Sequence, residues 1–91
     1  MTLTVSTEAA AWYKEELGLQ SGDSLRFFGK VYGTNGFSLA INKAQPTKSS
    51  IHTLVDDILF YIEDTDAWFF EDRDLNITMD EVLNEPKFNM Q

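Results

Sequence analysis

The 91-residue chain carries seven basic and fifteen acidic residues, which gives a formal net charge of −8. A chain of this length forms one small domain with a thin core, because a small domain buries only about 60% of the surface that its unfolded chain exposes. The two Trp, three Tyr and seven Phe argue against disorder. The acidic excess opposes non-specific binding to nucleic acid or to an anionic membrane. Composition therefore indicates a soluble acidic domain without identifying its function.

Cysteine is absent. The chain alone therefore cannot form disulfides, thiolate catalytic sites, or zinc and iron–sulfur centres held by cysteine. A small secreted domain usually needs disulfides, so their absence favours a cytoplasmic location. No signal-peptide pattern is visible, and the apolar run Ile58–Ile62 is far shorter than the ~20 residues of a membrane-spanning helix. No repeat or linker interrupts the chain, so we expect one domain over residues 1–91.

The first elements expected are a short strand at Leu3–Val5 and an amphipathic helix after it. Ser6 is a suitable N-cap, Glu8 suits the positive end of the helix dipole, and Gly18 can end the helix in a left-handed conformation. Apolar side chains share one arc of this helix, although Glu16 also falls within it. The members of the arc are Ala9, Ala10, Trp12, Tyr13 and Leu17. This pattern predicts a helix that packs on a sheet.

Alternation of side chains predicts a β-hairpin in the next segment. Leu25, Phe27, Gly29 and Val31 fall on one face, and Arg26, Phe28 and Lys30 fall on the other. The glycines and the Asn-Gly pair of residues 33–36 suit a tight turn, after which Phe37, Leu39 and Ile41 alternate again.

The sequence of the second half of the chain predicts several more short elements. They are strands at Ile51–Leu54, Ile58–Ile62 and Leu75–Met79, a turn at Asp56–Asp57, a helix at Thr65–Phe70 capped by Asp64, and a helical turn at Asp80–Asn84 stopped by Pro86. The fold class expected is α+β and rich in β-structure.

Charge is distributed unevenly along the chain. Residues 24–50 carry four basic residues and no acid, whereas residues 56–85 carry eleven acids and only Arg73 as a basic residue. Such a run is ordinarily a solvated acidic face. The alternative is an acidic docking surface, for which Glu71, Asp72 and Asp74 are the candidate residues, or self-association through complementary charges.

No constellation of residues predicts catalysis. His52 is the only histidine, so the chain has no histidine pair for a metal site. The acids from Asp72 onward lack the glycine and the final glutamate of a calcium loop. The basic and aromatic face of Arg26, Phe28 and Lys30 is too small to predict nucleic-acid binding against a charge of −8. No activated nucleophile or base is evident, so we expect a protein that is not an enzyme.

Four short segments resemble the HesB/IscA family of A-type iron–sulfur carriers. The opening Leu3–Ser6 before an Ala-rich helix resembles the start of that family, and the strand Ser24–Phe27 with the loop Gly33–Phe37 resembles its ligand hairpin. Leu83–Glu85 resembles the family's Leu-Asn-Glu segment near the C-terminus. The resemblance implies a small β-sandwich or flattened barrel with short helices packed against it, and a homo-oligomer.

The chain departs from that family at the cluster ligands. Thr34 stands where the family has its hairpin cysteine, and the Cys-Gly-Cys near the family's C-terminus has no counterpart. A threonine hydroxyl is a poor iron ligand beside a thiolate. The chain therefore resembles the cysteine-less, YneR-like branch of the family, and we expect no bound cofactor and no resident metal.

Two functions follow as hypotheses. The first is a non-enzymatic interaction or adaptor module that binds a protein partner through the Thr34–Asn35 loop or the acidic residues, without nucleic acid or membrane. The alternative is an accessory carrier of iron or of an iron–sulfur cluster, with ligands supplied by a partner or a small thiol. Iron content and partner binding would discriminate between them.

Overall fold

The computed structural model describes residues 1–32 and 36–91, and it describes the side chains of these residues except at positions 31, 32, 36 and 37. The described elements follow in chain order as strands and two helices. They are β1 (Leu3–Val5), α1 (Thr7–Glu16), β2 (Ser24–Tyr32), β3 (Gly36–Lys43), β4 (Ser49–Val55), β5 (Ile58–Glu63), a 3₁₀ turn (Asp64–Asp66), α2 (Ala67–Phe70), β6 (Leu75–Asp80) and β7 (Glu85–Met90). The fold is α+β and rich in β-structure, which confirms the class expected from the sequence.

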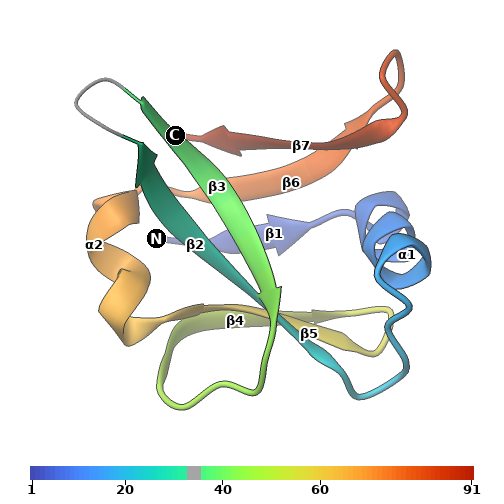
Figure 1. Ribbon diagram of the computed structural model, residues 1–91, viewed down its shortest axis with the longest axis horizontal. Coiled ribbons are helices and arrows are strands. Elements are labelled where there is room, and N and C mark those ends of the chain that lie inside the picture. Colours follow the sequence, from blue (N-terminus) through green and yellow to red (C-terminus); the bar gives the residue numbers. More distant parts are fainter. Residues whose placement is uncertain (33–35) are drawn as a thin grey trace.

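The strands form two mixed sheets (Figure 1). The smaller sheet has the order β1-β6-β7, with β1 parallel to β6 and β7 antiparallel to it. The larger has the order β3-β2-β5-β4, with β2 parallel to β5. β1 contacts β4, so the two sheets meet there. β3 and β7 each form one edge of their sheet, and β4 and β1 form the other edges. Helix α1 packs against β6 and β7.

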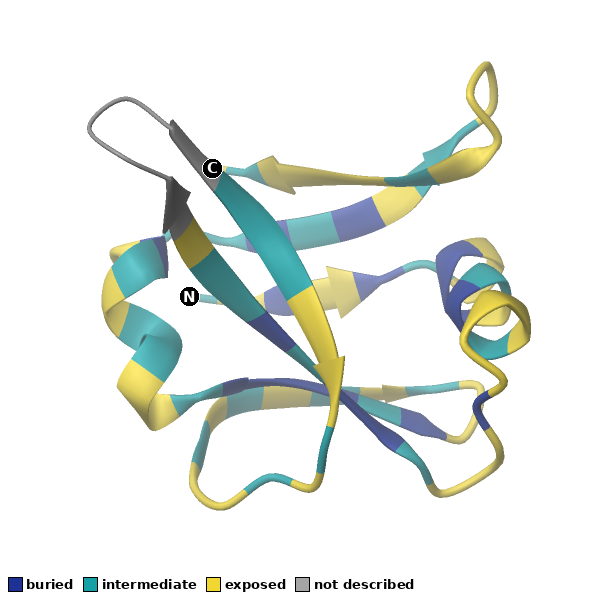
Figure 2. Ribbon diagram, viewed as in Figure 1, coloured by how far each residue is buried: buried dark blue, intermediate teal, exposed yellow. Residues whose placement is uncertain are grey.

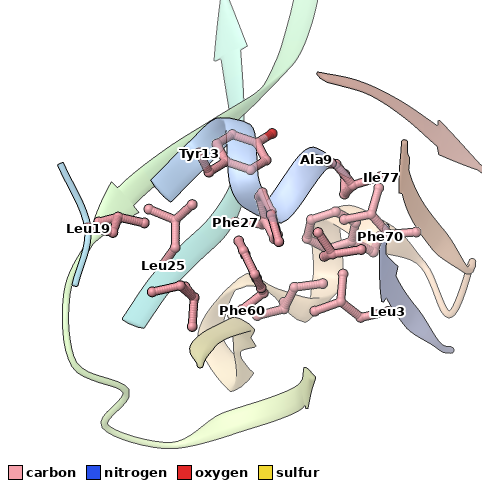
Figure 3. Packing of buried hydrophobic residues seen from close by; sticks show 14 residues of the cluster. Leu3, Ala9, Tyr13, Leu19, Leu25, Phe27, Phe60, Phe70 and Ile77 are labelled. Carbon is pink, nitrogen blue, oxygen red and sulfur yellow. The ribbon is translucent and has the colours of Figure 1, made fainter. Parts of the chain in front are cut away.

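The hydrophobic core lies where the two sheets and α1 face one another (Figures 2 and 3). Phe27 of β2 and Phe60 of β5 are fully buried, and their rings stack with centroids 5.9 Å apart. The ring of Tyr13 on α1 lies 6.0 Å from each of them. Aromatic packing of this kind contributes beyond simple area burial. The core is therefore organised around three rings from three elements.

Helix α1 begins as its sequence predicts. The Ser6 hydroxyl oxygen accepts a hydrogen bond from the Ala9 backbone N–H at 3.1 Å, and Gly18 adopts a φ of 62° after the helix. Ala9 and Ala10 are fully buried, and their small side chains allow close approach to the sheet. The prediction for Leu17 is wrong, because this residue follows the last helical turn and is 41% exposed. No described helix is long and apolar enough to cross a membrane.

Two predictions for the second half are also wrong. Residues 81–84 form the tip of a β6–β7 hairpin, and Pro86 lies within β7 opposite Met79. Proline is tolerated there because β7 pairs on one side only. Asp64 does not cap a helix over 65–70, because it is the first residue of the 3₁₀ turn that precedes α2 and its carboxylate pairs with Lys48.

Candidate functional site

Helix α2 packs directly on β2 through one glycine. Gly29 of β2 faces the ring of Phe69, and an ideal Cβ at position 29 would overlap that ring. Figure 1 shows α2 beside the part of β2 that leads toward residues 33–35. The absence of a side chain at Gly29 therefore brings α2 close to the β2–β3 hairpin.

An ion pair fixes the start of α2 on the same strand. The Arg26 guanidinium donates to the Asp66 carboxylate, with Nε to Oδ2 at 2.7 Å and Nη2 to Oδ1 at 2.8 Å. The Asp66 side chain is only 14% exposed, and its hydrogen bonds raise the pKa of Arg26. The guanidinium carbon also lies 4.6 Å from the centre of the Phe28 ring. The basic and aromatic face of β2 thus serves to hold α2.

Helix α2 presents one large aromatic side chain outward. Trp68 is 65% exposed, and its ring contacts Phe69 edge to face at 5.9 Å. Phe69 in turn contacts Phe70 at 5.1 Å, and Phe70 is fully buried. Trp68 is therefore an exposed ring that rests on a partly buried one, Phe69. Trp68 is not among the site residues expected from the sequence, although three consecutive aromatic residues at 68–70 mark this segment.

The predicted acidic residues follow α2 directly. Glu71 and Asp72 are exposed, and both adopt left-handed φ angles, 50° and 61°. Within the part of the chain that the structure describes, neither takes part in an ion pair. Both carboxylates are therefore carried by the tight turn that follows α2 in the chain.

Asp74 lies differently from the other two predicted acids. Its carboxylate Oδ1 accepts from the Thr2 backbone N–H at 2.8 Å, and its backbone pairs with Gln91 in both directions at 2.9 and 3.0 Å. Asp74 thus joins β1 and the end of β7 to β6. Thr34 and Asn35, the predicted loop residues, lie outside the described residues.

The uneven charge of the sequence is partly neutralised inside the fold. Arg26 pairs with Asp66, and Lys48 Nζ lies 3.5 Å from Asp64 Oδ2, so two cations of residues 24–50 meet two acids of the second half. The acids that remain unpaired near α2 are Glu71 and Asp72. Trp68, Glu71 and Asp72 together are called the α2 face below.

The other groups considered for chemistry, the single histidine and a metal site, are not found at the α2 face. His52 is exposed on β4, opposite Tyr61 of β5. Among residues 1–32 and 36–91, no three His, Asp or Glu side chains are grouped so as to hold a metal ion. The site that the structure does present is an aromatic side chain flanked by carboxylates.

Comparison with known proteins identifies relatives over the whole chain. No family model matches the sequence. A Bacillus subtilis protein named "Pyruvate dehydrogenase inhibitor" is 40% identical over 95 residues, which span 100% of both chains. The chain belongs to the family of that inhibitor. An uncharacterized protein of Staphylococcus saprophyticus is 33% identical over 93% of this chain and 94% of its own length. These relatives do not test the resemblance to HesB/IscA proteins, which stays a prediction.

Proposed function

We propose that this protein is a non-enzymatic inhibitor of a pyruvate dehydrogenase complex and that it acts by binding the complex. The observation that carries the proposal is the 40% identity to the Bacillus subtilis inhibitor over the full length of both chains. The proposal gives a specific partner to the interaction module expected from the sequence. The proposal retains the expectation that the domain is HesB/IscA-like and lacks the cysteines that bind a cluster.

The α2 face supports a role in docking. Exposed tryptophans often provide a large share of the binding energy at protein interfaces. Trp68 is 65% exposed yet rests on a ring that contacts the core, so little side-chain freedom remains to be lost on binding. Glu71 and Asp72 would favour a basic surface on the partner and would increase the association rate.

Inhibition of the purified complex tests the proposal. NADH formation by the pyruvate dehydrogenase complex of the same organism is measured at increasing concentrations of this protein. We expect inhibition to saturate near one molecule per binding site and to reverse on dilution. Failure to inhibit in excess would overturn the proposal. Progressive inactivation by substoichiometric amounts would overturn its non-enzymatic part.

Variants of the α2 face test where docking occurs. Trp68→Ala should raise the half-inhibitory concentration by tenfold or more, since about 1.4 kcal/mol corresponds to tenfold and central aromatic anchors contribute about 2 kcal/mol or more. Glu71→Gln with Asp72→Asn should slow association and weaken its salt dependence. Leu54→Ala is the matched control, because Leu54 is 67% exposed on β4. Equal inhibition by Trp68→Ala and the control would place docking elsewhere.

A further inference from the structure

A groove lies between β3 of the larger sheet and β7 of the smaller sheet, at a distance from the α2 face. Its volume is about 310 Å³, and its walls come from α1, β3 and β7. Its apolar lining comes from Leu39 and Ile41 of β3, Pro86 and Phe88 of β7, and Trp12 and Tyr13 of α1. Figure 1 places α1 and α2 on opposite sides of the view. Ile41 and Phe88 are 36% and 45% exposed, so apolar surface is open to solvent here.

One polar group in this groove has no partner. Tyr13 is only 7% exposed, and no described residue accepts a hydrogen bond from its hydroxyl. Figure 3 shows the Tyr13 oxygen pointing away from Phe27 and Phe60, and Tyr13 is one of the residues that line the groove. Burial raises the pKa of Tyr13 to about 12, so the group is a neutral donor at physiological pH. In the described part of the chain no buried side-chain polar atom lacks a partner, so the Tyr13 hydroxyl reaches solvent and is available to donate to a bound acceptor.

A second hollow adjoins the first and is acidic. Its volume is about 440 Å³, and it shares Trp12 with the groove. Ala11, Trp12 and Met79 provide an apolar floor. The carboxylates around it are those of Glu8, Glu15, Asp80 and Glu81.

The negative charge of these carboxylates is little compensated by positively charged groups of the chain. Asp80 accepts from the backbone N–H groups of Val82 and Leu83, and Lys87 lowers its pKa further from a position outside the hollow. Among the described residues, Glu8, Glu15 and Glu81 form no ion pair. Glu85 adds another carboxylate at the apolar groove. A cationic ligand group would therefore be favoured beside an apolar one.

A second copy of this chain does not fit such a surface well. The chain has seven basic residues and a net charge of −8. Four of the seven, Lys14, Arg26, Lys43 and Lys48, are already ion-paired within the fold. A second copy would bring mainly like charge to the acidic hollow.

We propose that the two hollows on either side of Trp12 bind a peptide segment of a partner protein that carries a large apolar residue next to Lys or Arg. The apolar side chain enters the groove between β3 and β7, and a backbone carbonyl of the segment accepts from the Tyr13 hydroxyl. The basic side chain enters the hollow around Glu15 and Glu81. Recognition of this kind combines an apolar anchor with charge complementarity. The inference is independent of the pyruvate dehydrogenase proposal, because it concerns another surface and is tested with peptides alone.

Selection from a random 12-residue peptide library on phage, with the purified full chain as target, tests the inference. We expect enriched peptides to place Lys or Arg within a few residues of Leu, Ile, Phe or Trp. Synthetic copies of these peptides are then titrated and their dissociation constants measured at low and high salt. No enrichment, or enrichment of acidic or wholly apolar peptides, would overturn the inference.

Three variants locate the binding. Tyr13→Phe removes only the hydroxyl and should raise the dissociation constants of the peptides about five- to tenfold. It should not lower the melting temperature, because the hydroxyl has no acceptor in the free protein. Glu15→Gln with Glu81→Gln should weaken binding about fivefold and reduce its salt dependence. Glu16→Gln is the matched control, since Glu16 is exposed on α1 and lines neither hollow.

The outcomes are distinguishable even if one variant folds poorly. Peptides that bind both groove variants as tightly as the control would overturn the inference. Dimerisation of the chain that competes with the peptides and is lost in Tyr13→Phe would show that a second copy occupies the groove, and would also overturn it. Neither result bears on inhibition through the α2 face.

Discussion

Arg26 and Asp66, 40 residues apart in the sequence, are joined by two parallel hydrogen bonds of 2.7 and 2.8 Å. The pair connects the segment that carries only basic charges to the segment that carries mostly acidic ones. It also fixes the turn that leads into α2, so the position of Trp68 depends on it. A two-point contact of this geometry is among the stronger ion pairs in proteins.

The Arg26–Asp66 pair is expected to stabilise the fold measurably. Arg26→Ala and Asp66→Ala should each lower the free energy of unfolding, and the double variant should lose less than the sum of the two. We expect a coupling of about 1–2 kcal/mol, above the usual value for exposed pairs, because Asp66 is only 14% exposed. Urea unfolding of the four proteins measures the coupling. The same cycle on Lys48 and Asp64, which are 82% and 52% exposed, should give a value near zero; equal couplings would contradict the prediction.

Gly29→Ala is expected to displace α2. A methyl group at this position would overlap the Phe69 ring. Relieving that overlap should cost about 1–3 kcal/mol of unfolding free energy and weaken inhibition through the α2 face. Phe69→Ala removes the clash, so the double variant should lose less than the sum of the two single losses. Strictly additive losses of unfolding free energy would contradict the prediction, because they would show that the new methyl group does not clash with Phe69.

The β6–β7 hairpin should respond to acid through Asp80. Backbone N–H groups of Leu83 and Val82, together with Lys87, hold the pKa of Asp80 below its ordinary value. The ionised carboxylate therefore stabilises the fold above its unfolded pKa of about 3.9, and this contribution is lost as pH falls through the lower folded pKa. Asp80→Ala should lower the melting temperature at pH 7 and make a smaller difference near pH 2. Glu81→Ala is the matched control, because it removes a neighbouring carboxylate that accepts neither of these hydrogen bonds.

Thr34→Cys tests the argument from ligand count. The substitution supplies one thiolate to a chain that has none. A family-type cluster needs more cysteine ligands than one, so we expect no stoichiometric iron or sulfide after anaerobic reconstitution of the untagged variant without added thiol. The unsubstituted protein is the control. A stable cluster in the variant would contradict the argument and would favour the carrier hypothesis.

Local features of the fold were predictable because they depend on few residues. The Ser6 cap, the left-handed Gly18 and the Asp56–Asp57 turn, with φ angles of 52° and 63°, follow from short-range backbone preferences. The β2–β3 hairpin was predictable from alternation, and Leu25 and Phe27 are fully buried as that pattern requires.

The remaining features depend on tertiary context. Pro86 argues against a strand unless β7 is known to be an outer strand, and that depends on the sheet order. Trp68 was not distinguished from a core aromatic, since exposure depends on how α2 lies on Gly29. The groove at Tyr13 joins three elements distant in sequence, so no local pattern could reveal it.

The parallel pairing of β1 with β6 has a consequence for the timing of folding. Thr4 lies opposite Asn76, 72 residues later in the sequence. At a synthesis rate of about 5–20 residues per second, roughly 4–14 s pass between the appearance of β1 and that of its sheet partner β6. Leu3 and Val5, both buried in the finished fold, must wait unpaired through that interval. The smaller sheet therefore cannot nucleate folding from the N-terminus, and its formation begins only after residue 77 has been made.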